Sequence, residues 1–310
     1  MITETEKNKI SSELALDAET VECFKKSGRI SAEALAYGKT LVKRGTRVVD
    51  VLDKIDEKIR QLGGECGFPS QMSFNDTAAH NCPDEGDEML LDGQVVKLDV
   101  GAQVDGCVTD NALTVDLSGK WGDLVKASRE ALDAVLKIVA PGVTLGEMGR
   151  TVHDVIRGYG YTPIRNLSGH GIGKFLVHTR PGIPNFDTGD KTTLDAGMTI
   201  AIEPFASTGA GMVYEKGDAG VFMFAQKKPV RDMFSRQVLQ FIQHYNRLPF
   251  AKRWITREFG PGKANFALRQ LVQLDIIREY PPLVDEKHGI VSQAEESVLV
   301  AEKPVFLTRV

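Results

Sequence analysis

Residues 97–112 read KLDVGAQVDGCVTDNA and place two aspartates in strand-like sequence on either side of an Asp-Gly turn signal. This pattern predicts a β-hairpin. If its turn centres on 104–105, Asp99 and Asp110 stand opposite each other; if it centres on 105–106, Asp110 faces Gly101 and Asp99 is its diagonal neighbour. In both registers the carboxylates share one face, with Cβ atoms roughly 4.5 to 8 Å apart. Two carboxylates that close repel each other unless a proton or a cation lies between them.

Three more segments, rich in glycine or in strand signals, contain side chains of the types that commonly bind metals. They hold His170 in SGHGIG (168–173) with His178 downstream, Glu203 at the end of TIAIE (199–203), and Glu295 in QAEE (293–296). Acidic residues in apolar strand sequence are costly to bury without a balancing cation. Oxygen ligands with one imidazole suit Mn, Fe, Co or Zn, and four carboxylates with one histidine would hold two ions about 3.5 to 4 Å apart.

Composition sets the broad class of the protein. The 310 residues are 42% hydrophobic with a net charge of −4, which is typical of a soluble globular chain and gives no reason to expect nucleic acid or a membrane as partner. The four cysteines are scattered and form no CxxC pair, so a reduced, cytoplasmic compartment is expected. Residues 1–20 are polar and contain no apolar signal-peptide core, and they predict a solvated lead-in to the first helix.

Two stretches of the chain resemble each other. Residues 45–64 align with residues 142–161 at an offset of 97, and glycine opens both. The first has an apolar stripe at helical spacing, Val48, Val51, Leu52, Ile55 and Ile59, within a helical region predicted over 31–62. The alignment predicts two similar halves, each with a helix that follows a glycine.

Between the segments that carry Glu203 and Glu295 the character of the sequence changes. Residues 229–287 show helical stripes and few strand signals, with ten Lys and Arg against six Asp and Glu. We predict a small helical subdomain at 229–287, inserted into a catalytic domain made of residues 1–228 and 288–310. A solvated insert is favoured over a nucleic-acid reader. Dinucleotide, P-loop, serine-elbow and HExxH motifs are all missing from the sequence.

Taken together, these residues resemble the methionine aminopeptidases of the "pita-bread" fold, and more closely their type II branch in its archaeal form. The resemblance runs from about residue 19 to the end of the chain. It includes the eleven-residue spacing of the aspartates, the eight-residue spacing of His170 and His178, and the runs NLSGHGIG (166–173) and EPFASTG (203–209). It implies an α+β fold of two pseudo-twofold halves around a mixed, mainly antiparallel sheet, with a winged-helix-like insert.

The resemblance also implies a role for each site residue. Asp99 would bind one of two divalent ions (Co, Mn, Fe or Zn), Asp110 and Glu295 would bridge the pair, and His170 and Glu203 would complete the other. Glu203 would act as general base, His178 would stabilise the tetrahedral intermediate, and His80 would hydrogen-bond the scissile amide. Phe68 and Pro69 match positions that line the methionine pocket. The departures are Ala294 and Glu296 around the last ligand and Asn81-Cys82 after His80.

The implied activity is removal of the N-terminal methionine from nascent proteins and peptides, with preference for a small second residue. A monomer in the cytoplasm is expected; association with the ribosome is left open, because nothing in the insert indicates it. The alternatives are an X-Pro aminopeptidase or prolidase of the same fold, which carries an extra N-terminal domain, and a non-catalytic pita-bread binding protein, which loses ligands.

Overall fold

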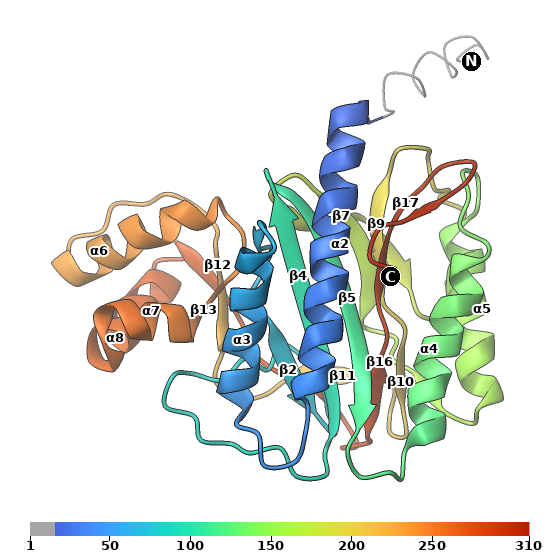
Figure 1. The fold of residues 1–310 in the computed structure, drawn as a ribbon, viewed down its shortest axis with the longest axis horizontal. Coiled ribbons are helices and arrows are strands. Elements are labelled where there is room, and N and C mark those ends of the chain that lie inside the picture. The colour runs from blue at the N-terminus through green and yellow to red at the C-terminus, as the bar shows by residue number, and fades with distance from the viewer. Residues whose placement is uncertain (1–15, 310) are drawn as a thin grey trace.

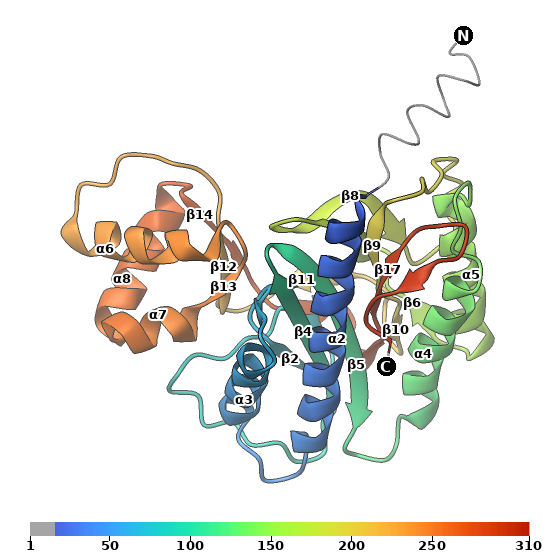
Figure 2. The ribbon, with the colours of Figure 1, turned by 45° about the horizontal axis from the view of Figure 1, so that its top comes forward.

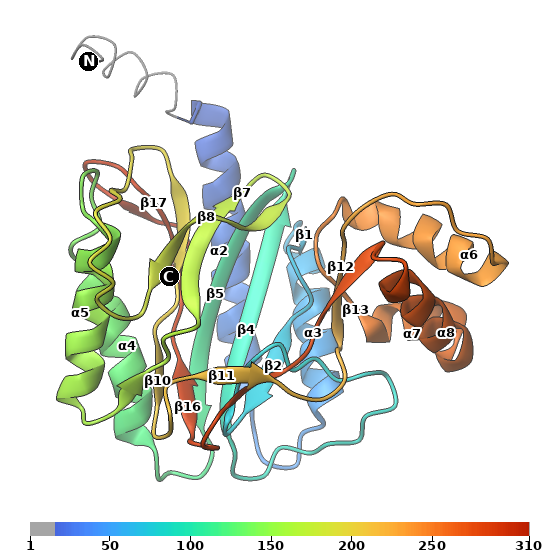
Figure 3. The same ribbon diagram turned by 180° about the vertical axis from the view of Figure 1, so that it is seen from behind.

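The computed structural model describes residues 16–309. Four long helices lie against a set of strands, and a group of shorter helices projects to one side (Figure 1). Seen from behind, the strands β4, β5, β7 and β8 lie in front of the helices (Figure 3). No helix in the described part of the chain is long and apolar enough to cross a membrane.

The predicted hairpin is present as β4 (Val95–Val104) and β5 (Cys107–Asp116). Val104 pairs with Cys107, so the turn centres on Asp105 and Gly106, whose φ angles are 45° and 88°. Positive φ at both turn residues is what a two-residue type I′ hairpin requires. Of the two registers left open by the sequence, the structure therefore has the second, in which Gly101 faces Asp110.

Two helices cover this hairpin, α2 (Ala18–Leu41) and α3 (Val48–Gln61). The first helix begins within the expected 1–20 lead-in, of which residues 1–15 lie outside the described residues, and the helical region predicted over 31–62 is broken around Gly45. The hydroxyls of Ser27 and Ser31 donate to the β4 carbonyls of Ala102 and Val100, each at 3.0 Å. The five residues of the predicted apolar stripe on α3 are all 0% exposed, which confirms that this face is core.

The second half repeats the arrangement of the first. Its helices are α4 (Gly122–Leu136) and α5 (Leu145–Gly158), and its strands are β6 (Thr162–Pro163), β7 (Ser168–Gly173), β8 (Leu176–Pro184) and β9 (Thr199–Ile202). α5 begins 97 residues after α3, and each follows the same turn: Gly45 donates to Leu91 O at 2.7 Å and Gly142 donates to Leu194 O at 2.8 Å. The internal duplication predicted from the sequence is thus visible as matching backbone geometry.

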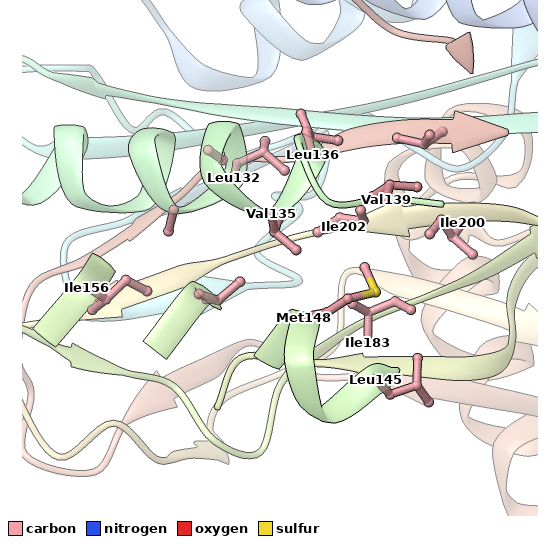
Figure 4. Close-up of a cluster of buried hydrophobic side chains, with 14 of the residues drawn as sticks. Leu132, Val135, Leu136, Val139, Leu145, Met148, Ile156, Ile183, Ile200 and Ile202 are labelled. Atoms are coloured by element: carbon pink, nitrogen blue, oxygen red, sulfur yellow. The ribbon is translucent and has the colours of Figure 1, made fainter. Parts of the chain in front are cut away.

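The core of the second half lies between α4, α5 and β9. Side chains such as Leu132, Val135 and Met148 meet Ile200 and Ile202 there, as Figure 4 shows. Each of these residues is at most 1% exposed. Burying one such side chain contributes about 1.5–3 kcal/mol, so this layer holds β9 and the residue after it, Glu203, in a fixed position.

The remaining strands complete the small sheets of the body. They are β1 (Glu65–Cys66), β2 (Gln71–Phe74), β3 (Thr77–Ala79), β10 (Phe205–Ser207), β11 (Val213–Glu215), β15 (Leu283–Asp285), β16 (Val291–Gln293), β17 (Glu296–Leu299) and β18 (Val305–Phe306). Reciprocal backbone hydrogen bonds between Ala112 and Glu295 join β5 to the segment between β16 and β17. The described strands form five small sheets, and every pairing among them is antiparallel. The mainly antiparallel pairing that the resemblance implied is therefore present.

The insert forms a compact unit at one edge of the body (Figure 2). It contains β12 (Val221–Phe224), α6 (Met233–Ile242), a 3₁₀ turn (Gln243–Tyr245), β13 (Phe250–Ala251), α7 (Lys252–Phe259), α8 (Pro261–Gln273) and β14 (Ile277–Tyr280). β12 pairs with β13 and β14, whereas β15 pairs with β11 and β3 of the body. The paired strands of this unit thus extend from Val221 to Tyr280, and the predicted insert at 229–287 contains its three helices.

A buried arginine fixes the insert to the body. Arg253 of α7 is 0% exposed, and its guanidinium donates to Asp53, Asp56 and the thiol of Cys82. Asp56 of α3 is itself buried and also accepts from the Trp254 indole at 3.2 Å. Beside it the half-exposed Arg257 pairs with Asp53 and Glu85. The insert is therefore held by one buried and one exposed arginine that share a carboxylate.

We expect Arg253→Met to lower the free energy of unfolding by roughly 3–5 kcal/mol, because Asp56 would be left buried without its counter-charge. Arg257→Met is the matched control and should cost about 0–1 kcal/mol, as an exposed ion pair does. Urea denaturation followed by circular dichroism measures both. Equal losses in the two variants would show that burial of the Arg253 pair does not hold the insert.

Candidate metal centre

The expected metal ligands come from five segments that meet at one place. Asp99 lies on β4 and Asp110 on β5, where the register makes them diagonal neighbours on one face. His170 on β7 pairs with Ala201 on β9, so Glu203, two residues further, lies on the same face as His170. Backbone hydrogen bonds between Glu295 and Ala112, two residues after Asp110, place Glu295 beside Asp110.

Distances between these side chains are short. His170 Nε2 lies 3.6 Å from Asp110 Oδ2 and 3.8 Å from Glu203 Oε1. Asp110, His170 and Glu295 each present one ligand atom within 4.8 Å of the others. Gln293, a residue that the sequence did not single out, donates from Nε2 to Glu295 Oε2 at 3.4 Å. These distances allow Asp110, His170 and Glu295 to share one metal ion.

Burial makes this cluster of acids costly without a cation. Burial raises the pKa of Asp99 to about 7. Burial, followed by repulsion from Glu295 and Asp99, raises the pKa of Asp110 well above its ordinary value. The pKa values of Glu203 and Glu295 are raised well above theirs for the same kinds of reason, burial first and neighbouring carboxylates second.

The unpaired atoms of the cluster fit a divalent metal. Asp99 Oδ1, Asp110 Oδ1 and Glu295 Oε1 are buried and have no hydrogen-bond partner among the described residues. Burial lowers the pKa of His170 to about 3, so its imidazole is neutral at physiological pH. Its Nδ1 lies 3.2 Å from the carbonyl of Gly171. Donation from Nδ1 leaves Nε2, which faces the carboxylates, as the ligand atom.

The carboxylates line a cavity of about 220 Å³. Its other walls come from both halves and from the insert, and include Phe68, Gln71, Ala79, His80, Leu167, Val177, His178, Phe205, Val221, Pro249 and Tyr280. Pro69, expected in the pocket wall with Phe68, is buried but is not among the lining residues. The contributions of Pro249 and Tyr280 were missed because nothing in the insert's sequence shows which of its residues turn towards the body.

Two further histidines face the cavity. The rings of His170 and His178 lie 4.2 Å apart between centroids, and the ring of His80 lies 5.6 Å from that of Tyr280. Burial lowers the pKa of His80 to about 4 and also lowers that of His178, so both imidazoles are neutral near pH 7. His80 follows β3 with a φ of 65°, a left-handed conformation that is uncommon outside glycine, although histidine adopts it more readily than most residues.

The carboxylate beside the last ligand belongs to a different environment. Glu296 is buried on the opposite side of its strand from Glu295, as alternation predicts, and pairs with Arg129 at 2.7 Å. Arg309 also contacts the Glu296 carboxylate and pairs with Asp133. Glu296 therefore neutralises two arginines near the C-terminal strand and takes no part in the metal cluster.

The raised carboxyl pKa values predict how pH acts on the metal-free protein. The folded state retains protons that the unfolded chain releases near pH 4, so stability falls as pH rises through the folded pKa values, about 7 for Asp99. The buried histidines act in the opposite direction, but only up to their unfolded pKa of about 6.5. Between pH 6.5 and 8 we expect Tm of chelator-treated protein to fall, and added Mn²⁺ to raise Tm more at pH 8.

Scanning fluorimetry with and without chelator measures this change. Glu295→Gln, which has one acid fewer in the cluster, should show a smaller fall between the same pH values. A Tm that responds neither to pH in this window nor to Mn²⁺ would contradict the presence of a cation site built from these acids.

Comparison with known proteins agrees with the geometry. Residues 22–227 match the family model of metallopeptidase family M24. A methionine aminopeptidase of Thermococcus onnurineus is 40% identical over 290 residues, which cover 93% of this chain and 98% of the relative. One of Methanocaldococcus jannaschii is 39% identical over 94% of this chain and 99% of its own length.

Among solved structures, a thermophilic Arx1 has a TM-score of 0.83 over 94% of this chain and 91% of that chain. Its sequence identity of 17% limits this likeness to the fold. The nearly full-length matches to the two archaeal aminopeptidases confirm the resemblance found in the sequence. The chain therefore belongs to metallopeptidase family M24 and, within it, to the group of the archaeal methionine aminopeptidases.

Proposed function

We propose that this protein is a metal-dependent aminopeptidase that removes the N-terminal methionine from proteins and peptides, with preference for a small second residue. The observation that carries the proposal is the match to methionine aminopeptidases over nearly the whole of both chains. The cavity supports it, because about 220 Å³ is below the roughly 300–1,000 Å³ of typical ligand pockets and suits one side chain rather than a long peptide.

Five residues would hold the metal. We assign Asp99 to one divalent ion, Asp110 and Glu295 to a shared position, and His170 with Glu203 to a second ion. When bound, such ions polarise the scissile carbonyl and lower the pKa of water, so that a nucleophile is available at neutral pH. The ligand set accepts Co, Mn, Fe or Zn, among which availability decides.

Glu203 is the proposed general base. Its carboxylate lies 3.8 Å from His170 Nε2 at the edge of the cluster and lines the cavity. Burial raises its pKa well above the ordinary value, which strengthens the carboxylate as a proton acceptor. In this role Glu203 takes a proton from the attacking water and delivers it to the amine that leaves.

His178 and His80 are proposed to bind the reacting amide. Each is neutral at physiological pH, so each ring carries one N–H donor and one acceptor nitrogen. His178, whose ring packs against that of His170, would donate to the oxygen that gains charge in the tetrahedral intermediate. His80, whose ring packs against that of Tyr280, would hydrogen-bond the scissile amide and help the amine to leave.

The apolar wall of the cavity suits a methionine side chain. Phe68 packs in a cluster with Val108, Val177 and Leu248, and Phe68 and Val177 both reach the cavity. Methionine is unbranched and polarisable, so it fills such an irregular apolar space well. All four cysteines carry free thiols, which supports the proposed cytoplasmic location. Nascent chains are the natural source of N-terminal methionine, and we propose action as a monomer.

Incubation of metal-loaded protein with Met-Ala-Ser and with X-Pro peptides, followed by mass detection, tests this function. We expect release of methionine from Met-Ala-Ser and no cleavage before proline. Cleavage before proline alone would identify an X-Pro peptidase, and no cleavage of either peptide would favour a binding protein.

The Glu203→Gln variant, assayed with the same peptides, tests whether Glu203 is the general base. It should lower kcat by at least about 10²-fold, the lower end of what a general base contributes. Glu296→Gln, the neighbouring acid on the other face, is the control and should retain turnover within a few-fold. Near-normal turnover by folded Glu203→Gln would reject Glu203 as the base.

A further inference from the structure

One polar side chain in the cavity wall has no partner. Gln71 begins β2, lines the cavity and is 7% exposed. Its Oε1 is buried and accepts no hydrogen bond within residues 16–309. A buried carboxamide without partners is costly, and native proteins seldom retain one without a reason.

The register of β2 fixes where this side chain lies. Gln71 pairs with Asp99 across β2 and β4, and the backbone N–H of the next residue, Met72, donates to the carbonyl of Asn81, just beyond His80. Phe68 lies three residues before Gln71, and its ring occupies the space that a side chain at Gly101 would fill. Gln71 therefore stands where the metal cluster, His80 and the apolar wall meet.

The other uncharged polar groups of the cavity are already engaged. Both ends of the Asn166 carboxamide bond to the backbone of Val213, at 2.7 and 2.9 Å. The Tyr280 hydroxyl donates to the sulfur of Met223 at 3.8 Å. Ser168 is exposed. Apart from the histidines proposed to bind the amide, Gln71 is thus the buried uncharged polar side chain among the described cavity residues that remains available to a ligand.

The geometry points to Gln71 as the residue that distinguishes methionine from a hydrocarbon side chain of the same length, by donating an amide N–H to the thioether sulfur. This inference rests on the proposed function and names how the side chain of the substrate is recognised. A thioether sulfur is a weak acceptor and cannot donate, whereas a glutamine amide offers two donors. Because no protein group fixes the carboxamide, a half turn about its last bond can present either end to the cavity.

An alternative occupant of the free carboxamide is Asp99, its cross-strand neighbour. In that case Gln71 would orient a metal ligand, and its loss would lower metal content and slow every substrate alike. Recognition of sulfur has a different consequence, because only substrates with an acceptor at that position lose binding. The two roles are separated by comparing methionine with norleucine, which replaces the sulfur by a methylene group.

The experiment measures kcat/KM of the metal-loaded protein for Met-Ala-Ser and norleucine-Ala-Ser. We expect the native protein to prefer methionine, although norleucine is the more apolar side chain. In Gln71→Met, which keeps an unbranched side chain of similar length, the methionine-to-norleucine ratio should fall by about twofold, the lower end for loss of one hydrogen bond, because a thioether sulfur is a weak acceptor. Metal content by atomic absorption should stay unchanged.

Several results would overturn the inference. The inference is wrong if the native protein prefers norleucine or if the methionine-to-norleucine ratio is unchanged in Gln71→Met. An unchanged ratio together with lower metal content would show that Gln71 instead orients Asp99 as a metal ligand. If Gln71→Met does not fold, the methionine-to-norleucine ratio is measured for Gln71→Leu and compared with that of the native protein. Failure of the native protein to cleave either peptide would instead reject the proposed function, and this inference with it.

Discussion

The burial of four carboxylates against one another is the constraint on which the rest of the structure depends. Asp99, Asp110, Glu203 and Glu295 lie where burial and mutual repulsion raise the pKa of each one. A chain that only had to fold would place apolar residues there, because an unpaired buried charge is strongly destabilising. The cluster is stable as a set of anions only with cations between them, so metal binding and the stability of the fold are coupled.

The duplicated architecture explains how such a cluster can be assembled. Each half contributes a helix-covered set of strands that is held by its own apolar core. The first half supplies Asp99 and Asp110, and the second supplies His170 and Glu203. The halves are joined through backbone hydrogen bonds between Ala112 and Glu295, directly beside the ligands. The two cores therefore determine the geometry of the acids, while the insert closes the cavity with Pro249 and Tyr280.

Much of the fold and of the metal cluster could be predicted, because the sequence signals for them lie within short segments of the chain. The Asp-Gly turn placed Asp99 and Asp110 on one face, although two registers remained until the structure showed Gly101 opposite Asp110. Repeated glycine-opened helices revealed the two halves. Contacts over long sequence distances could not be predicted: Tyr280 in the cavity and Arg253 buried against Asp56 depend on how separate elements pack.

Whether the unpaired oxygens of the cluster bind metal ions can be tested directly. Crystals of the protein soaked in Mn²⁺ and measured at the manganese absorption edge would locate bound ions without reference to activity. We expect anomalous density between Asp110 and Glu295 and beside His170. Crystals in which the cavity contains no manganese, with these acids turned outward or hydrogen-bonded to one another as neutral groups, would contradict this expectation.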